Sequence, residues 1–229
     1  MTSTFQKVEP VSKKERVVSS VKAAILSGAL KSGEAIVEGK VAQQFGVGQG
    51  LIREALIELE HEGFVQRTPF SGTQVVRLSA EDAQQIFDLR IALEPLAVSL
   101  AGSALTPEKL EELERLANKS QRAADAEKID AFFESHLALR RRIWELSGNR
   151  YLRQALERAV IPLYALYLIR RSSKRDRIMT TVTDCIEHQQ KLLTAYKAGD
   201  FAEAERVARD FLVQTKEYLR TALPAAGEL

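Results

Sequence analysis

The sequence predicts a mostly α-helical protein built from two dissimilar parts. Glycine is the first sign: eight of the 12 glycines lie in residues 1–78 and only four in residues 79–229, so the first part breaks into short elements. The second sign is apolar spacing at helical intervals, which persists from Ser79 almost to the end of the chain. We therefore expect two domains, 1–78 and 79–229.

Composition excludes several classes of protein. Apolar residues make up 45% of the 229 positions, enough for a real core, and Cys185 is the only cysteine, so an intrachain disulfide is impossible. No apolar run is long enough for a membrane span, and the first residues lack a secretion signal, so we expect a cytoplasmic protein without membrane contact. The net charge of +2 is too small to indicate nucleic acid, but ten Lys and Arg against eight Asp and Glu place this excess in residues 1–78.

The first part resolves into three short helices and a hairpin. Ser12 followed by Glu15 is a capping-box spacing that begins a helix, and glycine ends it at Gly28. A second helix is expected over residues 38–45, with Phe45 facing inward, and a third over residues 49–61. Strands are expected at 64–68 and 73–77, around a turn at 69–72.

Three helices followed by a small β-hairpin predict a winged helix-turn-helix. In that module the third helix enters the major groove of double-stranded DNA and the hairpin wing reaches backbone or minor groove. Lys13, Lys14 and Arg16 are further candidates for backbone contact. Two alternatives remain: such modules also bind proteins, and Arg53 can pair with a neighbouring carboxylate instead of DNA. The candidate DNA contacts are Lys40, Gln49, Gly50, Arg53, Arg67, Ser71, Gly72 and Thr73.

The same stretch resembles the DNA-binding domain of the GntR family of bacterial regulators. The resemblance rests on Ile36, Glu38, Val41-Ala42, Gly46-Val47, Arg53-Glu-Ala-Leu56, Glu62-Gly63 and Gly72. It implies a DNA-binding transcription regulator, which we expect to act as a repressor and to bind a pseudo-palindromic operator as a homodimer. The sequence departs from the family where Gln49, Gly50 and Leu51 replace the usual Arg, Thr and Pro, so base preference cannot be carried over.

The second part predicts an antiparallel bundle of six helices. Ser79 and the pair Thr106-Pro107 begin the first two helices, and the turn 147–149 separates the third from the fourth. The fourth is expected over 151–172 with a kink at Pro162, the fifth over 177–198 and the sixth over 201–223.

This part resembles the C-terminal, FCD-type ligand-binding domain of the FadR branch of the family. The resemblance rests on residues 88–94, 147–149, 187–188 and 198–200. It implies a helical domain that dimerises and binds a small effector. Many members hold a divalent metal with an Asp and three His, but here His136, Arg140, Gln189 (or His188, one residue earlier) and Phe211 occupy those positions. Since Arg and Phe cannot ligate zinc, we expect no metal and no cofactor.

The resemblance also places Arg90 where relatives meet an effector carboxylate. Arg140 adds a second guanidinium, and two cations favour an anionic effector through bidentate pairing. We therefore expect an effector site for a carboxylate. An internal salt bridge from Arg90 to Asp88, Glu94 or Glu187 is an equally weighted alternative, and His136 can be an ordinary core histidine. The expected effector-site residues are Arg90, His136, Arg140, His188 and Gln189.

Enzymatic function is not expected. The sequence contains no nucleophile elbow, phosphate loop or zinc-hydrolase motif. An enzyme would need an acid–base pair in the bundle, and only Glu187-His188 offers one. A winged-helix adaptor for protein contacts and a helical enzyme therefore stay as the two alternatives to an effector-controlled regulator.

Overall fold

The computed structural model describes residues 12–68, 72–170 and 175–222. The chain divides into two compact units, Met1–Val76 and Arg77–Leu229. The division in the sequence falls two residues before the expected boundary. No helix in the described part of the chain is long and apolar enough to cross a membrane.

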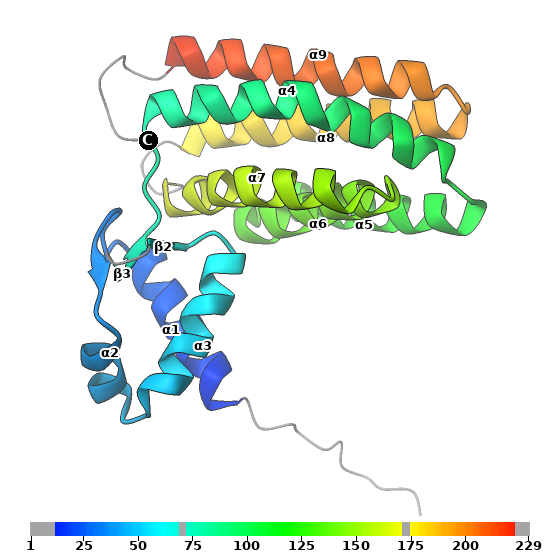
Figure 1. Cartoon of the computed structure of the whole chain (residues 1–229). Helices are drawn as coiled ribbons and strands as arrows, with labels where there is room; N and C mark the ends of the chain where they lie inside the picture. Colours follow the sequence, from blue (N-terminus) through cyan, green and yellow to red (C-terminus); the bar gives the residue numbers. More distant parts are fainter. Residues whose placement is uncertain (1–11, 69–71, 171–174, 223–229) are drawn as a thin grey trace, which may run out of the picture. The chain divides into compact units, whose positions relative to one another are not determined.

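The first unit begins with three helices, α1 (Lys13–Leu26), α2 (Glu38–Phe45) and α3 (Gln49–His61) (Figure 1). The predicted capping box is formed: Glu15 N–H donates to Ser12 Oγ at 3.1 Å, and Ser12 N–H donates to Glu15 Oε2 at 2.7 Å. The turn between α2 and α3 depends on Gly46, whose φ of +62° lies in the left-handed region that glycine adopts without strain.

The first unit also contains a small antiparallel sheet. The two predicted strands are present as β2 (Val65–Thr68) and β3 (Gly72–Val75), and a third strand, β1 (Ala35–Ile36), lies on the other side of β3. The sequence prediction missed β1 because a two-residue strand has no periodicity of its own; its pairing with β3 defines it.

The core of the first unit forms where α1, α3 and the sheet meet. Its largest fully buried members include Ile25, Ile52, Leu56 and Leu59, which recur on α1 and α3 at helical spacing. One expectation about this core was wrong: Phe45, at the end of α2, is 37% exposed rather than turned inward.

The second unit is a bundle of six long helices in which consecutive helices reverse direction (Figure 1). The predicted Thr106 cap and first-turn Pro107 begin the second helix, and Pro162 lies inside the fourth without ending it. Its helices are α4 (Ala80–Ser103), α5 (Pro107–Asp125), α6 (Ile129–Leu146), α7 (Arg150–Arg170), α8 (Arg175–Lys197) and α9 (Phe201–Ala222).

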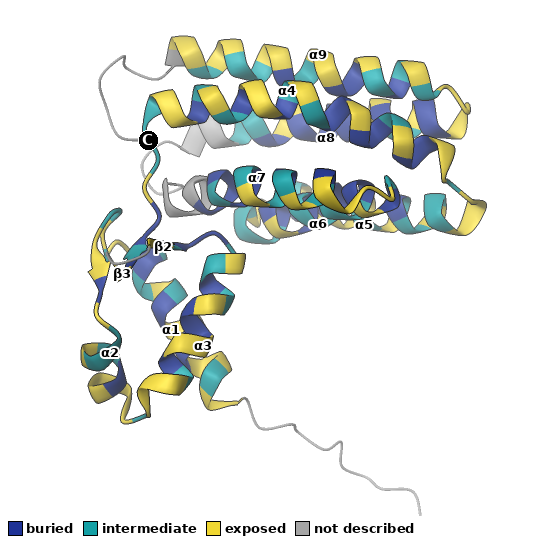
Figure 2. Ribbon diagram, viewed as in Figure 1, coloured by how far each residue is buried: buried dark blue, intermediate teal, exposed yellow. Residues whose placement is uncertain are grey.

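An apolar core joins α4, α5, α6, α8 and α9 (Figure 2). Tyr196 of α8 is buried in it and donates its hydroxyl proton to the carbonyl of Val98 on α4 at 2.8 Å. Gly102 lets α4 approach α9, because an added Cβ there would lie 2.5 Å from the ring of Phe201. These contacts hold α4 against α8 and α9, and the polar side chains described next lie among the same helices.

Candidate DNA surface and effector cavity

The N-terminal end of α3 presents the predicted reading residues to solvent. Gln49, Gly50 and Arg53 are exposed, whereas Ile52 and Leu56 hold the opposite face in the core. Solvent exposure at the start of the second helix of a helix-turn-helix is what contact with base edges requires.

Two of these side chains are positioned by α2. The Arg53 guanidinium is paired with Glu38, with 3.0 Å between Nη2 and Oε2. The alternative that Arg53 pairs with a carboxylate is therefore observed, but the carboxylate belongs to α2 and not to α3. Arg53 remains 57% exposed in that pair. The Gln49 amide lies beside Gly39, where an added Cβ would stand 3.3 Å from its nitrogen. Glycine at position 39 therefore leaves room for Gln49.

Glu58 of α3 and Glu62, which follows the end of that helix, pair with lysines of α1. Glu58 pairs with Lys14 at 2.6 Å and Glu62 pairs with Lys22 at 3.0 Å. A hydrogen bond and the charge of Glu58 raise the pKa of Lys14. These pairs keep carboxylates on the α1 side of α3, away from Gln49 and Arg53, and they occupy Lys14, which was a candidate for backbone contact.

The remaining predicted DNA contacts divide into exposed and buried residues. Lys40 and Arg67 are exposed and form no ion pair with a residue that the structure describes. Gly72 is exposed with a φ of +86°. Thr73 is corrected: it is 5% exposed, since its side chain lies on the covered face of β3. Ser71 lies outside the described residues.

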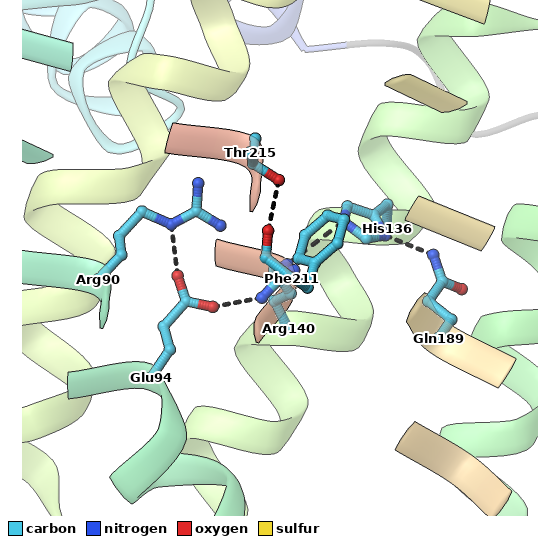
Figure 3. Close-up of polar contacts among 7 residues, drawn as sticks. All are labelled: Arg90, Glu94, His136, Arg140, Gln189, Phe211 and Thr215. Atoms are coloured by element: carbon cyan, nitrogen blue, oxygen red, sulfur yellow. Dashed lines mark hydrogen bonds and ion pairs between the residues drawn. The ribbon is translucent and has the colours of Figure 1, made fainter. Parts of the chain in front are cut away.

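In the second unit, Arg90 and Arg140 come together on one carboxylate (Figure 3). Arg90 Nε donates to Glu94 Oε1 at 2.5 Å, and Arg140 Nη1 donates to Glu94 Oε2. All three are buried. Burial would raise the pKa of Glu94, but the two guanidinium groups outweigh it and lower that pKa, so the cluster carries two positive charges and one negative charge.

His136 lies beside this cluster and is neutral. Burial, followed by the charge of Arg140, lowers the pKa of His136 well below 6.5. Arg140 Nε donates to His136 Nε2 at 3.2 Å, so the ring proton lies on Nδ1, which contacts the side-chain amide of Gln189. The amide orientation that satisfies this ring presents its oxygen to Nδ1. His136 is thus held by the side chains of Arg140 and Gln189.

His188 occupies a different position from its neighbour Gln189. Its ring stacks on Phe211, with centroids 4.2 Å apart and planes 13° apart. Burial and the charge of Arg140 lower its pKa well below 6.5. Two buried polar atoms here have no hydrogen-bond partner in the described structure: His188 Nδ1 and Arg140 Nη2. Buried polar atoms are usually paired, so these point to an additional partner.

A cavity of about 1020 Å³ opens beside these groups. Arg90, His136, Arg140 and His188 line it, as do residues that the sequence did not single out as part of a site. Tyr164 is buried, at 7% exposure, and also contributes to the wall. The wall also includes Asp184, Cys185, Glu187 and Phe211. The volume suits a small organic ligand.

The positions expected for metal ligands do not suit a divalent cation. His136 and Gln189 contact each other, Arg140 is bound to Glu94, and the Arg140 guanidinium carbon lies 5.7 Å from the centre of the Phe211 ring. Across the described residues, no group of three or more His, Cys, Asp or Glu side chains could hold a metal ion. A guanidinium at the centre of the cluster would repel a cation.

The acid–base pair that an enzyme would need does not form. Glu187 is exposed, whereas the adjacent His188 is buried against Phe211. Neighbouring residues on a helix point about 100° apart, so the two side chains diverge.

Comparison with known protein families identifies the family to which the chain belongs. The FCD domain matches residues 85–214, and the family described as "Bacterial regulatory proteins, gntR family" matches residues 13–75. This chain belongs to the GntR family and carries an FCD domain. The family and the relatives below are transcription regulators, not enzymes.

Named relatives of this GntR protein include three HTH-type regulators. YdhC of Bacillus subtilis, described as uncharacterized, is 33% identical over 61% of this chain, and the match spans 62% of YdhC. McbR of Escherichia coli is 27% identical over 85% of this chain and 86% of its own. The repressor GlaR of Escherichia coli is 26% identical over 82% of this chain and 87% of its own.

The structure of McbR from E. coli shares the fold of this GntR chain. It aligns with a TM-score of 0.69 at 24% identity, over 93% of this chain and 99% of that one.

Sequence reasoning alone found both arginines of the cavity but gave Glu94 only as one of three possible partners of Arg90. The signal that selects Glu94 is spacing, because it follows Arg90 by four residues on the same face of α4.

Proposed function

We propose that this protein is a transcription repressor that binds a pseudo-palindromic DNA operator as a homodimer and whose operator affinity is set by a small carboxylate in the bundle cavity. The observation that carries the proposal is the buried Arg90–Glu94–Arg140 cluster at the cavity, with its excess positive charge. Repression is the direction we propose because the relative GlaR is named a repressor.

DNA contact is supported by the exposed start of α3 and by cations left unpaired around it. Gln49 can bond adenine through both ends of its amide, and Arg53 can bond guanine or a phosphate. Lys40 and Arg67 are suited to phosphates, which set orientation and affinity rather than sequence.

The DNA proposal is tested by selecting a duplex from a random pool and measuring its affinity by fluorescence anisotropy between 50 and 200 mM salt, over which DNA affinity falls steeply. Gln49→Ala should change the preferred bases, whereas Lys40→Ala should weaken all duplexes alike and reduce the salt dependence. Lys119→Ala, an exposed lysine of α5, is the matched control. Affinity that does not respond to salt would favour the protein-adaptor alternative.

The homodimer is supported by an apolar stripe along the outer face of α4, defined by Leu89, Ala92, Leu96 and Leu100. Its leucines are 40%, 45% and 37% exposed, although the opposite face of the helix is in the core. With Ala92 included, apolar residues at spacings of three and four form one continuous face that a second copy can cover. Light scattering after size exclusion should show a dimer that Leu96→Glu dissociates and that Tyr151→Glu, at a 68% exposed residue of α7, leaves intact.

The carboxylate effector is supported by charge and by unmet hydrogen bonds. Two arginines share one carboxylate, so one positive charge remains uncompensated, and Arg140 Nη2 has no partner among the described residues. A ligand carboxylate would neutralise that charge by pairing with a guanidinium. Because His136 and His188 are neutral, they add no further positive charge, and a monoanion is the best match.

A panel of small carboxylates, scored first by thermal unfolding and then by operator affinity, tests the effector proposal. We expect a hit to change operator affinity by about 5- to 150-fold, the usual range of allosteric coupling. Arg90→Ala removes the excess charge yet leaves Glu94 paired with Arg140, so it should abolish the response while the protein stays folded. Arg142→Ala, which breaks a pair with Glu112 outside the cavity, should respond as the unmodified protein does. Equal responses in both variants would contradict the role of Arg90.

A further inference from the structure

The mouth of the cavity carries two carboxylates that the cluster at its inner end does not use. Asp184 and Glu187 lie one turn apart on α8, both line the cavity, and neither forms an ion pair with any residue that the structure describes. Lys191, on the next turn of α8, makes no such pair either. By contrast Glu203 and Asp210, which line the same cavity, are both bound by Arg206, at 2.8 Å and 2.7 Å.

The two free carboxylates act on each other. Partial burial and then the charge of Glu187 raise the pKa of Asp184, as expected when two like charges share one side of a helix and neither is held in an ion pair. A positive group placed between them would relieve that repulsion.

The acidic pair and the basic cluster face the same space. Cys185 also lines the cavity: burial raises the pKa of its thiol to about 11, while the charges of Arg140 and Arg90 act to lower it and that of Asp184 acts to raise it. Because Arg90, Arg140, Asp184 and Glu187 line one cavity, one small ligand could touch both groups.

An independent observation points to a ligand at this position. His188 follows Glu187 directly, lines the cavity and is 5% exposed, yet its Nδ1 has no hydrogen-bond partner in the described structure. A neutral imidazole can donate or accept through that nitrogen, depending on its tautomer. The side chain of His188 diverges from that of Glu187, but both residues line the same cavity, so the cavity contains a buried polar atom that lacks a partner in the described structure.

We propose that the effector is amphoteric, with a carboxylate that pairs with Arg90 and Arg140 and a protonated amine that pairs with Asp184 and Glu187. The carboxylate end rests on the function proposed above; the amine end rests on the acidic pair alone. The Arg90–Glu94–Arg140 cluster brings an excess positive charge to the cavity, and Asp184 and Glu187 bring negative charge that no ion pair with a described residue compensates, so a zwitterion matches both, whereas a simple carboxylate would leave the acidic pair uncompensated.

Matched probes of known structure test this assignment. The first series is the unbranched amino acids from glycine to 8-aminooctanoate, with the amine at the chain end; the second is the unbranched carboxylates of the same lengths; the third is the corresponding amines. Dissociation constants are measured by calorimetry on the full chain. We expect at least one amino acid to bind about fivefold or more tightly than its carboxylate counterpart, as two partly exposed ion pairs allow.

A double variant, Asp184→Asn with Glu187→Gln, removes both charges with little change of shape. It should abolish the preference for amino acids while the simple carboxylates bind as before. Glu205→Gln, which alters an exposed carboxylate paired with Arg209 instead, is the control and should keep the preference.

Each outcome separates the two proposals. Carboxylates that bind as tightly as the amino acids overturn the amphoteric assignment but leave the carboxylate effector standing. A preference that survives the double variant also overturns it, since the amine must then bind elsewhere. If no probe of the first two series binds, or binding is indifferent to Arg90→Ala, the carboxylate proposal fails and the amphoteric assignment fails with it.

Discussion

Removing the negative charge of Glu94 should strongly destabilise the helical unit. Glu94→Gln keeps the size of the side chain but leaves two guanidinium groups facing each other, in side chains that are only 6% and 8% exposed. Breaking a buried ion pair by removing one partner typically costs about 3–5 kcal/mol, because the remaining charge is buried without compensation. In a unit of this size each kcal/mol lowers the melting temperature by about 2–4 °C, so a loss of about 6–20 °C is expected.

The assay is urea unfolding followed by circular dichroism, with Glu112→Gln as the matched control. Glu112 also pairs with an arginine, Arg142, at 2.8 Å, but its side chain is 38% exposed, so its loss should cost about 1 kcal/mol or less. A double-mutant cycle with Arg140→Gln isolates the charge effect: Arg140→Gln should be less harmful once Glu94 is already neutral. A loss below about 1 kcal/mol in Glu94→Gln, or strictly additive effects, would refute the buried-charge reasoning.

Two further perturbations probe the same unit. Because folding lowers the pKa of His136 and His188, the unfolded chain binds more protons below pH 6.5, so the free energy of unfolding should fall from pH 6.5 to 5 by up to about 1.4 kcal/mol per pH unit for each histidine. His188→Gln should halve the slope of the unfolding free energy against pH, measured by urea titrations. An unchanged slope would contradict the contribution of His188. Gly102→Ala should lower stability despite the better helix propensity of alanine, because its Cβ meets the Phe201 ring, whereas Gly50→Ala, with open space around it, should be neutral or stabilising by up to about 1 kcal/mol. Calorimetric melting curves of the two variants measure these changes in stability. Equal changes in Gly102→Ala and Gly50→Ala would exclude the contact with Phe201 as the cause.

The starts of the helices were predictable from sequence because capping is local. Ser12 and Glu15, or Ser79 and Asp82, lie three residues apart, and each pair satisfies the exposed amides of a first turn without help from the rest of the chain. Glycines and the Thr106 cap add similar local signals, so six helices in the second part could be expected in order.

The features that sequence reasoning missed depend on contacts between distant residues. β1 is a strand only because β3 lies beside it, and Thr73 is buried because the sheet packs on that face. Arg53 finds its carboxylate 15 residues away, at Glu38. For Arg90, three partners were open; Glu94 is the one on its own helical face, while Asp88 is taken by Lys216 of α9.

The regulation we propose requires one element that belongs to both the effector site and the subunit interface, and α4 meets that requirement. Its inner face carries Arg90 and Glu94, and its outer face carries the apolar stripe, represented by Leu89 and Leu96. Only residues 77–79 separate the start of α4 from the end of the first unit. A ligand that draws the guanidinium of Arg90 toward itself would act on the helix that, in the proposed homodimer, also meets the second copy. Because packed helices have few alternative arrangements, a small shift of α4 is expected to select between two spacings of the reading helices rather than to deform the bundle gradually.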